Sequence, residues 1–276
     1  LESTLGIRVP ISVFRNPNDF SIFLLFAYFT SFYLTRVKKN RIDRLFSTVL
    51  MVWFLFMVVA TQSRASFAAL LLGTFIILFD RFKYLSAAKK SIIVVILLAS
   101  LSSVVAWVIA NKELYEALIA FEPDDAGSSD YARMLLIKNG LKIYGDSYGL
   151  GVGLGNIECH MAKFPDETGH IKNIHNWWME LLVSSGPFVL LYYLRIYIKS
   201  LVYHWRRLKK KYLPKEDHYL SLVLFVILLT YSFACLTSSS VMSSEWLWAF
   251  FGLIFVAPTC LKNNENLSRN QPPSSK

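Results

Sequence analysis

Residues 175–198 read HNWWMELLVSSGPFVLLYYLRIYI, a polar opening followed by an apolar run. A membrane-spanning helix needs roughly 20 such residues, so this run is long enough to cross a bilayer. Other apolar blocks of comparable length recur along the 276-residue chain and are separated by clusters of charge. The composition, with 54% hydrophobic and 17% charged residues, excludes a soluble globular domain. The sequence therefore predicts an all-α polytopic integral membrane protein.

We expect about seven transmembrane helices, with one long external loop between the fourth and the fifth. The third span is the shortest and has to include Ala65, Ser66 and flanking residues to cross the membrane. The segment Asn16-Pro-Asn-Asp19 marks the start of the first span. The predicted spans lie near residues 20–35, 45–60, 67–79, 91–110, 177–198, 219–236 and 246–261. The predicted parts are an N-terminal membrane part of four helices (1–110), the loop (111–176), a C-terminal membrane part of three helices (177–261) and a disordered cytoplasmic tail (262–276).

The distribution of basic residues predicts which helix ends face the cytoplasm. Of the 29 Lys and Arg residues, 19 lie in segments 36–44, 80–90, 199–215 and 262–276, which fall on one side of the membrane in this arrangement. By the positive-inside rule that side is cytoplasmic, and the loop 111–176 is external. The net charge of +10 is thus explained by topology, and we expect no nucleic-acid partner.

The chain begins at Leu1 without Met and without a charged leader, so we expect no signal peptide and interpret it as the C-terminal part of a longer protein. Its three cysteines, Cys159, Cys235 and Cys260, are too few and too scattered for a disulfide framework.

Two arginines on the external side are candidate anion-binding residues. Arg64 lies in the short gap between the second and third spans, where the positive-inside rule disfavours a cation. Its guanidinium suits bidentate phosphate binding, although an arginine that anchors a helix end is the alternative interpretation. Arg133 lies in the first turn of a helix predicted from about residue 129 to 143, where a bound anion would offset its repulsion by the helix dipole. A solvated surface charge is the alternative there.

The same loop contains four glycines at alternate positions, in GLGVGLG (149–155). The strand, helix and GxGxxG spacing of a dinucleotide-binding loop are missing. We therefore expect backbone that passes close to helix ends or to the phosphates of a ligand. In the helix before this segment, the apolar residues expected to pack on the bundle are Met134, Leu135, Ile137 and Leu141.

His175 is the candidate proton acceptor, because Trp177 and Trp178 place it at the membrane interface. A neutral imidazole there could remove a proton from a sugar hydroxyl, whereas an ordinary interfacial histidine is the alternative. His160, His170 and the acidic residues near them lack the spacing of a metal site, so we predict no metal and no cofactor.

These stretches, in this order, resemble the family of O-antigen ligases and O-antigen polymerases, bacterial envelope polysaccharide enzymes that include teichuronic-acid polymerase-like proteins. The resemblance covers roughly residues 14–195. The four stretches are Phe14–Asp19, Thr61–Ala65, Asp130–Asn156 and His175–Gly186.

The resemblance implies a membrane glycosyltransferase that moves a glycan from a polyprenyl-diphosphate carrier to an acceptor sugar, free or lipid-linked, at the outer face of the bacterial inner membrane. It implies that His175 is the catalytic base and that Arg64 and Arg133 hold the diphosphate. Gly153, Gly155 and Asn176 fall in the same motifs and are further substrate-binding candidates.

The alternative function is a transporter or flippase of lipid-linked oligosaccharides, which would need ionisable residues inside the spans. The predicted spans are nearly uncharged, which favours the enzyme. The sequence separates neither polymerase from ligase nor one sugar from another.

Overall fold

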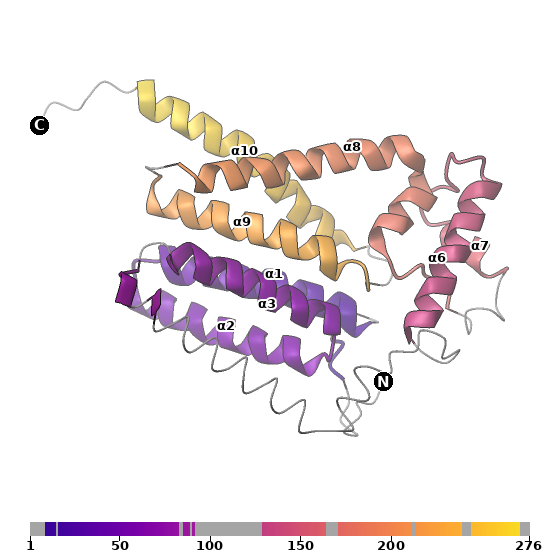
Figure 1. Cartoon of the computed structure of the whole chain (residues 1–276), viewed down its shortest axis with the longest axis horizontal. Helices are drawn as coiled ribbons and strands as arrows, with labels where there is room; N and C mark the ends of the chain where they lie inside the picture. Colours follow the sequence, from indigo (N-terminus) through magenta and orange to yellow (C-terminus); the bar gives the residue numbers. More distant parts are fainter. Residues whose placement is uncertain are drawn as a thin grey trace, which may run out of the picture.

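The computed structural model describes residues 9–14, 16–82, 85–88, 90–91, 129–163, 171–210, 213–238 and 244–270, and the regular secondary structure of these residues is all helical. Six helices in this part are long and apolar enough to cross a membrane. They are α1 (Pro17–Val37), α2 (Arg41–Ala60), α3 (Arg64–Phe82), α8 (Trp177–Leu208), α9 (Lys215–Ala234) and α10 (Glu245–Asn270). Two shorter helices, α6 (Ser129–Asp146) and α7 (Ile157–Met161), lie at one end of this bundle (Figure 1). The chain is therefore a polytopic helical membrane protein.

Six of the seven predicted spans coincide with these helices. The third span does include Ala65 and Ser66, because α3 begins at Arg64. The fourth, 91–110, lies outside the described residues apart from Ser91, so the number seven stays a prediction. The structure differs at the C-terminus, where α10 continues to Asn270 and so enters the tail that we expected to be disordered from residue 262. A helix that has already formed adds one hydrogen bond per residue, so its extension beyond the apolar segment costs little.

Asparagine side chains begin two of the spans. The Asn18 backbone N–H donates to Asn16 Oδ1 over 2.8 Å at the start of α1, which confirms the predicted helix start. The Ile42 N–H donates to Asn40 Oδ1 over 3.0 Å at the start of α2. Each contact supplies one of the amide groups at a helix start with an acceptor.

Helix α9 is the central element of the described bundle and packs against α1, α3 and α8. Its buried residues extend on all faces from Tyr219 to Tyr231, as expected for a helix surrounded by other helices. Close packing of α3 here depends on Gly73. A Cβ atom at this position would collide with Phe29 of α1 and lie 2.8 Å from Val226 Cγ1 of α9. Small residues allow this approach between membrane helices.

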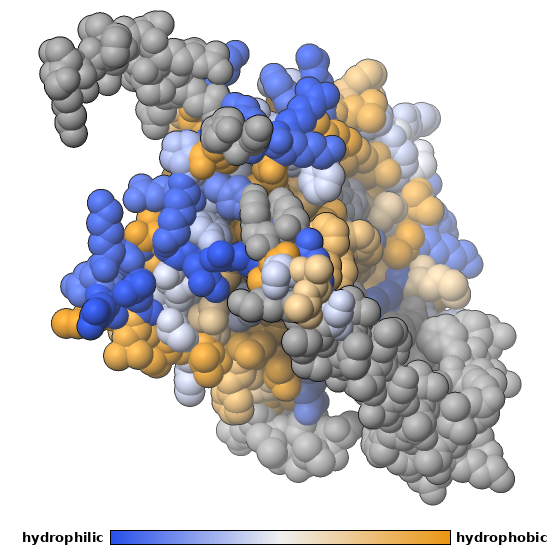
Figure 2. Space-filling model, turned by 60° about the vertical axis from the view of Figure 1, so that its left-hand side comes forward, coloured by the Kyte–Doolittle hydropathy of each residue, from blue (hydrophilic) through white to orange (hydrophobic). Residues whose placement is uncertain are grey.

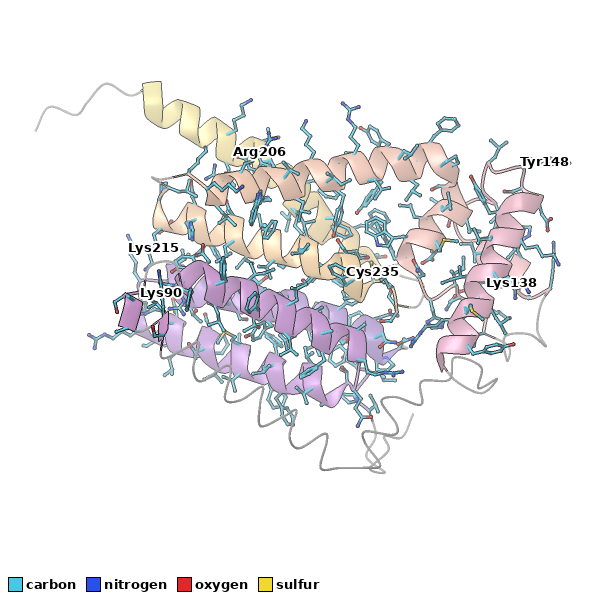
Figure 3. All side chains as sticks on the ribbon, in the orientation of Figure 1. Lys90, Lys138, Tyr148, Arg206, Lys215 and Cys235 are labelled. Carbon is cyan, nitrogen blue, oxygen red and sulfur yellow. The ribbon has the colours of Figure 1, made fainter. Side chains whose placement is uncertain are left out.

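The two ends of the bundle differ in chemistry. At the end that we call the basic end, α1, α3 and α8 finish and α2 and α9 begin, with Lys90 and Lys215 nearby (Figure 3). Figure 2 turns this end toward the viewer and shows hydrophilic side chains gathered over it. An ion pair and a hydrogen bond, both buried or half-buried, join its helices: Arg207 with Asp217 at 2.8 Å and His218 with Asp80 at 2.8 Å. The opposite end, where α6 and α7 lie, is called the α6 end.

Candidate functional site

A small second core fixes the elements of the α6 end. Ile143 of α6, Ile157 and Met161 of α7, Ile174, and Val183 of α8 form this cluster. Figure 1 shows α6 standing across the ends of the spanning helices rather than along them. The predicted loop helix is thus confirmed, and it is anchored on the first turns of α8.

The face of α6 that packs inward is only partly the one expected. Ile137 packs against the small core, as predicted. Met134 and Leu141 are 58% and 50% exposed, so the prediction that they pack on the bundle is wrong. The buried line instead follows Leu136, Gly140 and Ile143, which share one helix face. Gly140 explains why this face of α6 is the buried one, because even a Cβ at this position would lie 3.1 Å from Ile174 Cδ1. A helix turned onto its glycine can approach its neighbour more closely than one turned onto its larger apolar residues.

A break in α8 receives the glycine-rich segment. Proline at 187 has no N–H, so the carbonyl of Val183 lacks its usual helical donor. Gly186 leaves helical geometry at the same point, with φ 77° and ψ 178°. Two donors from the loop replace the missing helix bonds: Val152 N–H to Val183 O at 2.9 Å and Gly153 N–H to Ser184 O at 2.8 Å.

The glycines are required because two backbones touch at this break. A Cβ on Gly151 would lie 2.7 Å from both Gly186 N and Ser184 O, and a Cβ on Gly186 would lie 2.5 Å from Leu150 O. Gly151 also has φ +89°, which is unfavourable for a residue with a side chain. The sequence predicted that the glycine segment passes close to helix ends or to the phosphates of a ligand. Contact with a helix end is confirmed, at the end of the first part of α8. Contact of the segment with ligand phosphates stays a prediction.

His175 is held in a backbone conformation that is uncommon for a residue with a side chain. Its φ is 54°, in the left-handed region. Its neighbours impose this conformation: Ile174 is buried in the small core, and Asn176 caps α8 by accepting from Met179 N–H at 3.2 Å. A conformation of this kind persists where the surroundings determine it, and such positions cluster at functional sites.

Arg133 and His175 are brought together across the gap between α6 and α8. Arg133 precedes Leu136 by three residues, so its half-buried side chain leaves the inward face of α6. Burial lowers the pKa of the His175 imidazole, and the positive charge of Arg133 lowers it further. The imidazole is therefore neutral at pH 7 and has a lone pair that can accept a proton.

Arg64 is the first residue of α3 and lies in an exposed pocket between α2 and α3. The pocket has a volume of about 250 Å³, and its walls are mainly apolar, with contributions from Val58, Val59 and Phe67. Gln62 and Ser63 complete the lining. One cation in a mainly apolar pocket at the end of a membrane helix suits a ligand that has both a charged group and a hydrocarbon chain.

Packing contacts place Arg64 and His175 at the same end of the bundle. The Ser66 and Ser21 hydroxyls are 2.5 Å apart and tie the start of α3 to α1. Trp246 at the start of α10 lies against Phe26 of α1, and Trp177 at the start of α8 lies against Phe251 of α10. The structure thus places Arg133 close enough to His175 for its charge to lower the pKa of the imidazole, and it places Arg64 at the same end, in a separate pocket. Convergence of all three on one ligand stays a prediction.

The remaining candidates have structural roles that the sequence did not indicate. Gly153 and Gly155 are exposed with positive φ values, and Gly153 also donates to α8. Asn176 is the N-cap of α8. Their contacts with substrate stay predictions.

Several residues of the α6 end were missed or misread. Trp177 is fully buried and does not face lipid, because its backbone N–H donates to Cys235 O at 3.1 Å and its ring packs among α9 and α10 aromatics. Its position at the level of the membrane interface stays a prediction. Two carboxylates, Asp19 and Glu180, are 7% and 6% exposed at this end. Their position next to span starts was visible in the sequence, and their burial was not.

Within the described ranges, no three His, Cys, Asp or Glu side chains are grouped so that they could hold a metal ion. Asp166, Glu167 and His170 lie outside those ranges, so metal independence stays a prediction.

The spans and this end together define the class: a multi-pass membrane protein with a basic residue and a neutral imidazole juxtaposed at one end of its helices. Residues 49–194 match the O-Antigen ligase family, and this range contains all six candidate site residues. The chain belongs to this family, which confirms the resemblance noted in its sequence. It is 30% identical over 273 residues to the "Teichuronic acid biosynthesis protein TuaE" of Bacillus subtilis (strain 168), and the match covers 94% of this chain. The chain spans about half (54%) of the length of that relative.

Proposed function

We propose that this chain carries the transfer site of a membrane glycosyltransferase of the O-antigen ligase and polymerase type. The enzyme would move a glycan from a polyprenyl diphosphate to a sugar hydroxyl at the outer face of the bacterial inner membrane. The observation that carries the proposal is a mostly buried, neutral His175 imidazole within the electrostatic influence of Arg133, at the end of a bundle that belongs to this family. The acceptor is a free or lipid-linked glycan, and the similarity to a teichuronic acid biosynthesis protein supports an envelope polysaccharide as product.

The reaction requires a base on one side of the anomeric carbon and cations on the other. The acceptor hydroxyl oxygen forms a bond to the anomeric carbon while the bond from that carbon to the diphosphate oxygen breaks. His175 accepts the hydroxyl proton, for which its neutral form is needed. The diphosphate leaves with its added negative charge, which Arg133 and Arg64 stabilise electrostatically. The proton later passes to water and restores the imidazole.

Arg64 is assigned to the diphosphate because its pocket also offers a path for the lipid. The apolar side chains of Val58, Val59 and Phe67 line this pocket. On α2 the apolar surface continues with Leu55 and Phe56, which are 39% and 60% exposed. A polyprenyl chain that follows this surface stays in the hydrocarbon layer, and its diphosphate remains at the level of Arg64.

Transport of lipid-linked sugars is less well supported than transfer. A transporter needs ionisable groups that line a path through the spans. The buried ionisable groups of the described bundle instead gather near the span ends: Arg207 with Asp217 and His218 with Asp80 at the basic end, and Asp19 and Glu180 at the α6 end.

The test uses the protein, with any further part of its natural chain, in nanodiscs that contain a polyprenyl-diphosphate-linked glycan. His175→Asn is the informative variant, because asparagine adopts the left-handed conformation readily but has no basic nitrogen. We expect transfer to fall by roughly 10²–10⁴-fold, the usual contribution of a general base, while donor binding persists.

His160→Asn is the matched control, since His160 lies in α7 at the same end and is not assigned to the chemistry. It is expected to transfer glycan at the normal rate. Full activity of His175→Asn would overturn the proposal. Equal losses in both variants would also overturn it, because they would reflect a disturbed loop and not a missing base.

A further inference from the structure

The basic end of the bundle contains a cavity of about 400 Å³. It lies far from His175, which precedes the start of α8 at the other end of the spans. Four helices form it: the end of α1, the start of α2, the end of α3 and the start of α9. The charged side chains that line it are Arg36, Lys38, Lys39, Arg44, Arg81, Lys215 and Glu216.

The charge of this cavity is strongly positive. Of its described lining residues, six are cations and Glu216 is the one carboxylate. Two other carboxylates at this end are already engaged, Asp217 with Arg207 and Asp80 with His218. Six like charges around one cavity repel one another and favour a bound anion, more strongly beside the low-dielectric lipid than in bulk water.

Aromatic rings fix two of these cations at the walls. The Arg36 guanidinium carbon lies 5.1 Å from the centroid of the Phe32 ring, and that of Arg81 lies 5.1 Å from the centroid of the Tyr219 ring. Cation–π contacts of this kind hold a guanidinium in place without neutralising it by a carboxylate. The cavity is therefore a preorganised cationic site and not a loose collection of lysines.

An apolar surface leads away from this cavity along α2. Ile42, Leu45, Phe46 and Val49 lie in the first turns of α2 beside Arg44, and they are 57–74% exposed. Side chains of this kind on a membrane helix face lipid acyl chains. The cavity and the apolar surface both begin at the first turns of α2, where Arg44 lies on one face of the helix and the apolar side chains lie on another. A ligand with an anionic headgroup and hydrocarbon chains that pass around this helix end would contact both.

We infer that this cavity binds the headgroup of an anionic phospholipid, whose acyl chains lie along the outer face of α2. The phosphate contacts arginine and lysine donors, for which guanidinium groups offer paired N–H bonds. The site is separate from the proposed transfer site and needs no glycan substrate.

Native mass spectrometry of the delipidated protein tests this inference. The protein in detergent is titrated with phosphatidylglycerol, and with phosphatidylcholine as the net-neutral lipid. We expect preferential binding of phosphatidylglycerol. Lys38 and Lys39 are both exposed in the α1–α2 connection. The double variant Lys38→Gln with Lys39→Gln is expected to weaken this binding about 25-fold, because each basic residue contributes about 5-fold.

The matched control is the pair Lys138→Gln and Lys172→Gln, which removes two exposed cations from the α6 end. It is expected to leave the affinity for phosphatidylglycerol unchanged. Equal effects of the two pairs would overturn the inference, because they would show attraction by net charge alone.

A further arm separates a lipid site from a site for soluble anions. Glycerophosphoglycerol has the same headgroup without acyl chains, and inorganic phosphate has the anionic group alone. We expect both to bind far more weakly than phosphatidylglycerol and to compete poorly with it. Tight binding of either soluble anion would overturn the assignment to a lipid.

Discussion

Replacement of Gly151 by alanine tests the contact between the glycine-rich segment and the break in α8. The added Cβ would lie 2.7 Å from Gly186 N and Ser184 O, both backbone atoms that have no room to move aside. The left-handed backbone at φ +89° adds roughly 1–2 kcal/mol for a residue with a side chain. The overlap also pushes the two backbones apart, which breaks the hydrogen bonds to Val183 O and Ser184 O in the docked state, at about 1 kcal/mol each. The expected loss is therefore about 3–4 kcal/mol for the docked state.

Hydrogen exchange followed by mass spectrometry, on the protein in nanodiscs, measures this loss at the amides of Val152 and Gly153. A change of about 3 kcal/mol corresponds to exchange that is faster by about 100-fold. Two other glycines separate the causes. Gly155→Ala places a side chain on a backbone with φ +83° but with no atom nearby to collide with. Gly145→Ala in α6 brings neither a positive φ nor a collision. Protection of the Val152 and Gly153 amides is expected to be highest in Gly145→Ala, lower in Gly155→Ala and lowest in Gly151→Ala.

Unchanged protection of Val152 and Gly153 in Gly151→Ala would refute the contact between the two backbones. If Gly155→Ala loosens the segment as much as Gly151→Ala, the glycines are needed for their backbone freedom alone. The break in α8 would then not be the reason for Gly151.

Three further outcomes follow from the α6 end. Because burial and Arg133 lower the pKa of His175, the acidic limb of kcat/KM, where the imidazole gains its proton, is expected to have its midpoint below the value of about 6.5 for an ordinary histidine. Arg133→Gln is expected to move this acidic limb to higher pH, whereas Arg133→Lys is expected to reduce the rate and leave the limb in place. The pH dependence of kcat/KM for the two variants measures this, and an acidic limb of Arg133→Gln at the same pH as in the unchanged protein would contradict it. Asn176→Ala removes the cap of α8 and lowers stability by about 1 kcal/mol in thermal denaturation, whereas Asn176→Asp does not. Transfer is expected to continue in EDTA, and a loss of activity that magnesium or manganese restores would contradict metal independence.

The spans and their starts were predictable because they depend on local sequence. Apolar runs of about 20 residues identify membrane helices wherever they occur. The Asn16 cap likewise depends on a contact within two residues. The alternate glycines also indicated a close backbone approach, which the contact at Gly186 confirms.

The side chains that face the interior of the α6 end were not predictable, since tertiary contacts determine them. The apolar residues of α6 gave no reason to prefer Leu136 over Met134, and only the approach of Ile174 to Gly140 decides between them. Trp177 followed a polar loop and was read as an interfacial anchor, yet α9 and α10 enclose it. The juxtaposition of Arg133 with His175 joins residues that are distant in sequence, so the resemblance to a family was needed to suggest it.

The break in α8 has a mechanical consequence. His175 directly precedes the short first part of that helix, and the last carbonyls of the same part hold the glycine-rich segment. The base and the loop beside it therefore belong to one rigid piece, which is joined to the longer part of α8 through Gly186 and Pro187. If the two parts of α8 bend relative to each other at this joint, the imidazole and the loop move together. The alignment between them is then preserved while their distance from the membrane-embedded helices changes.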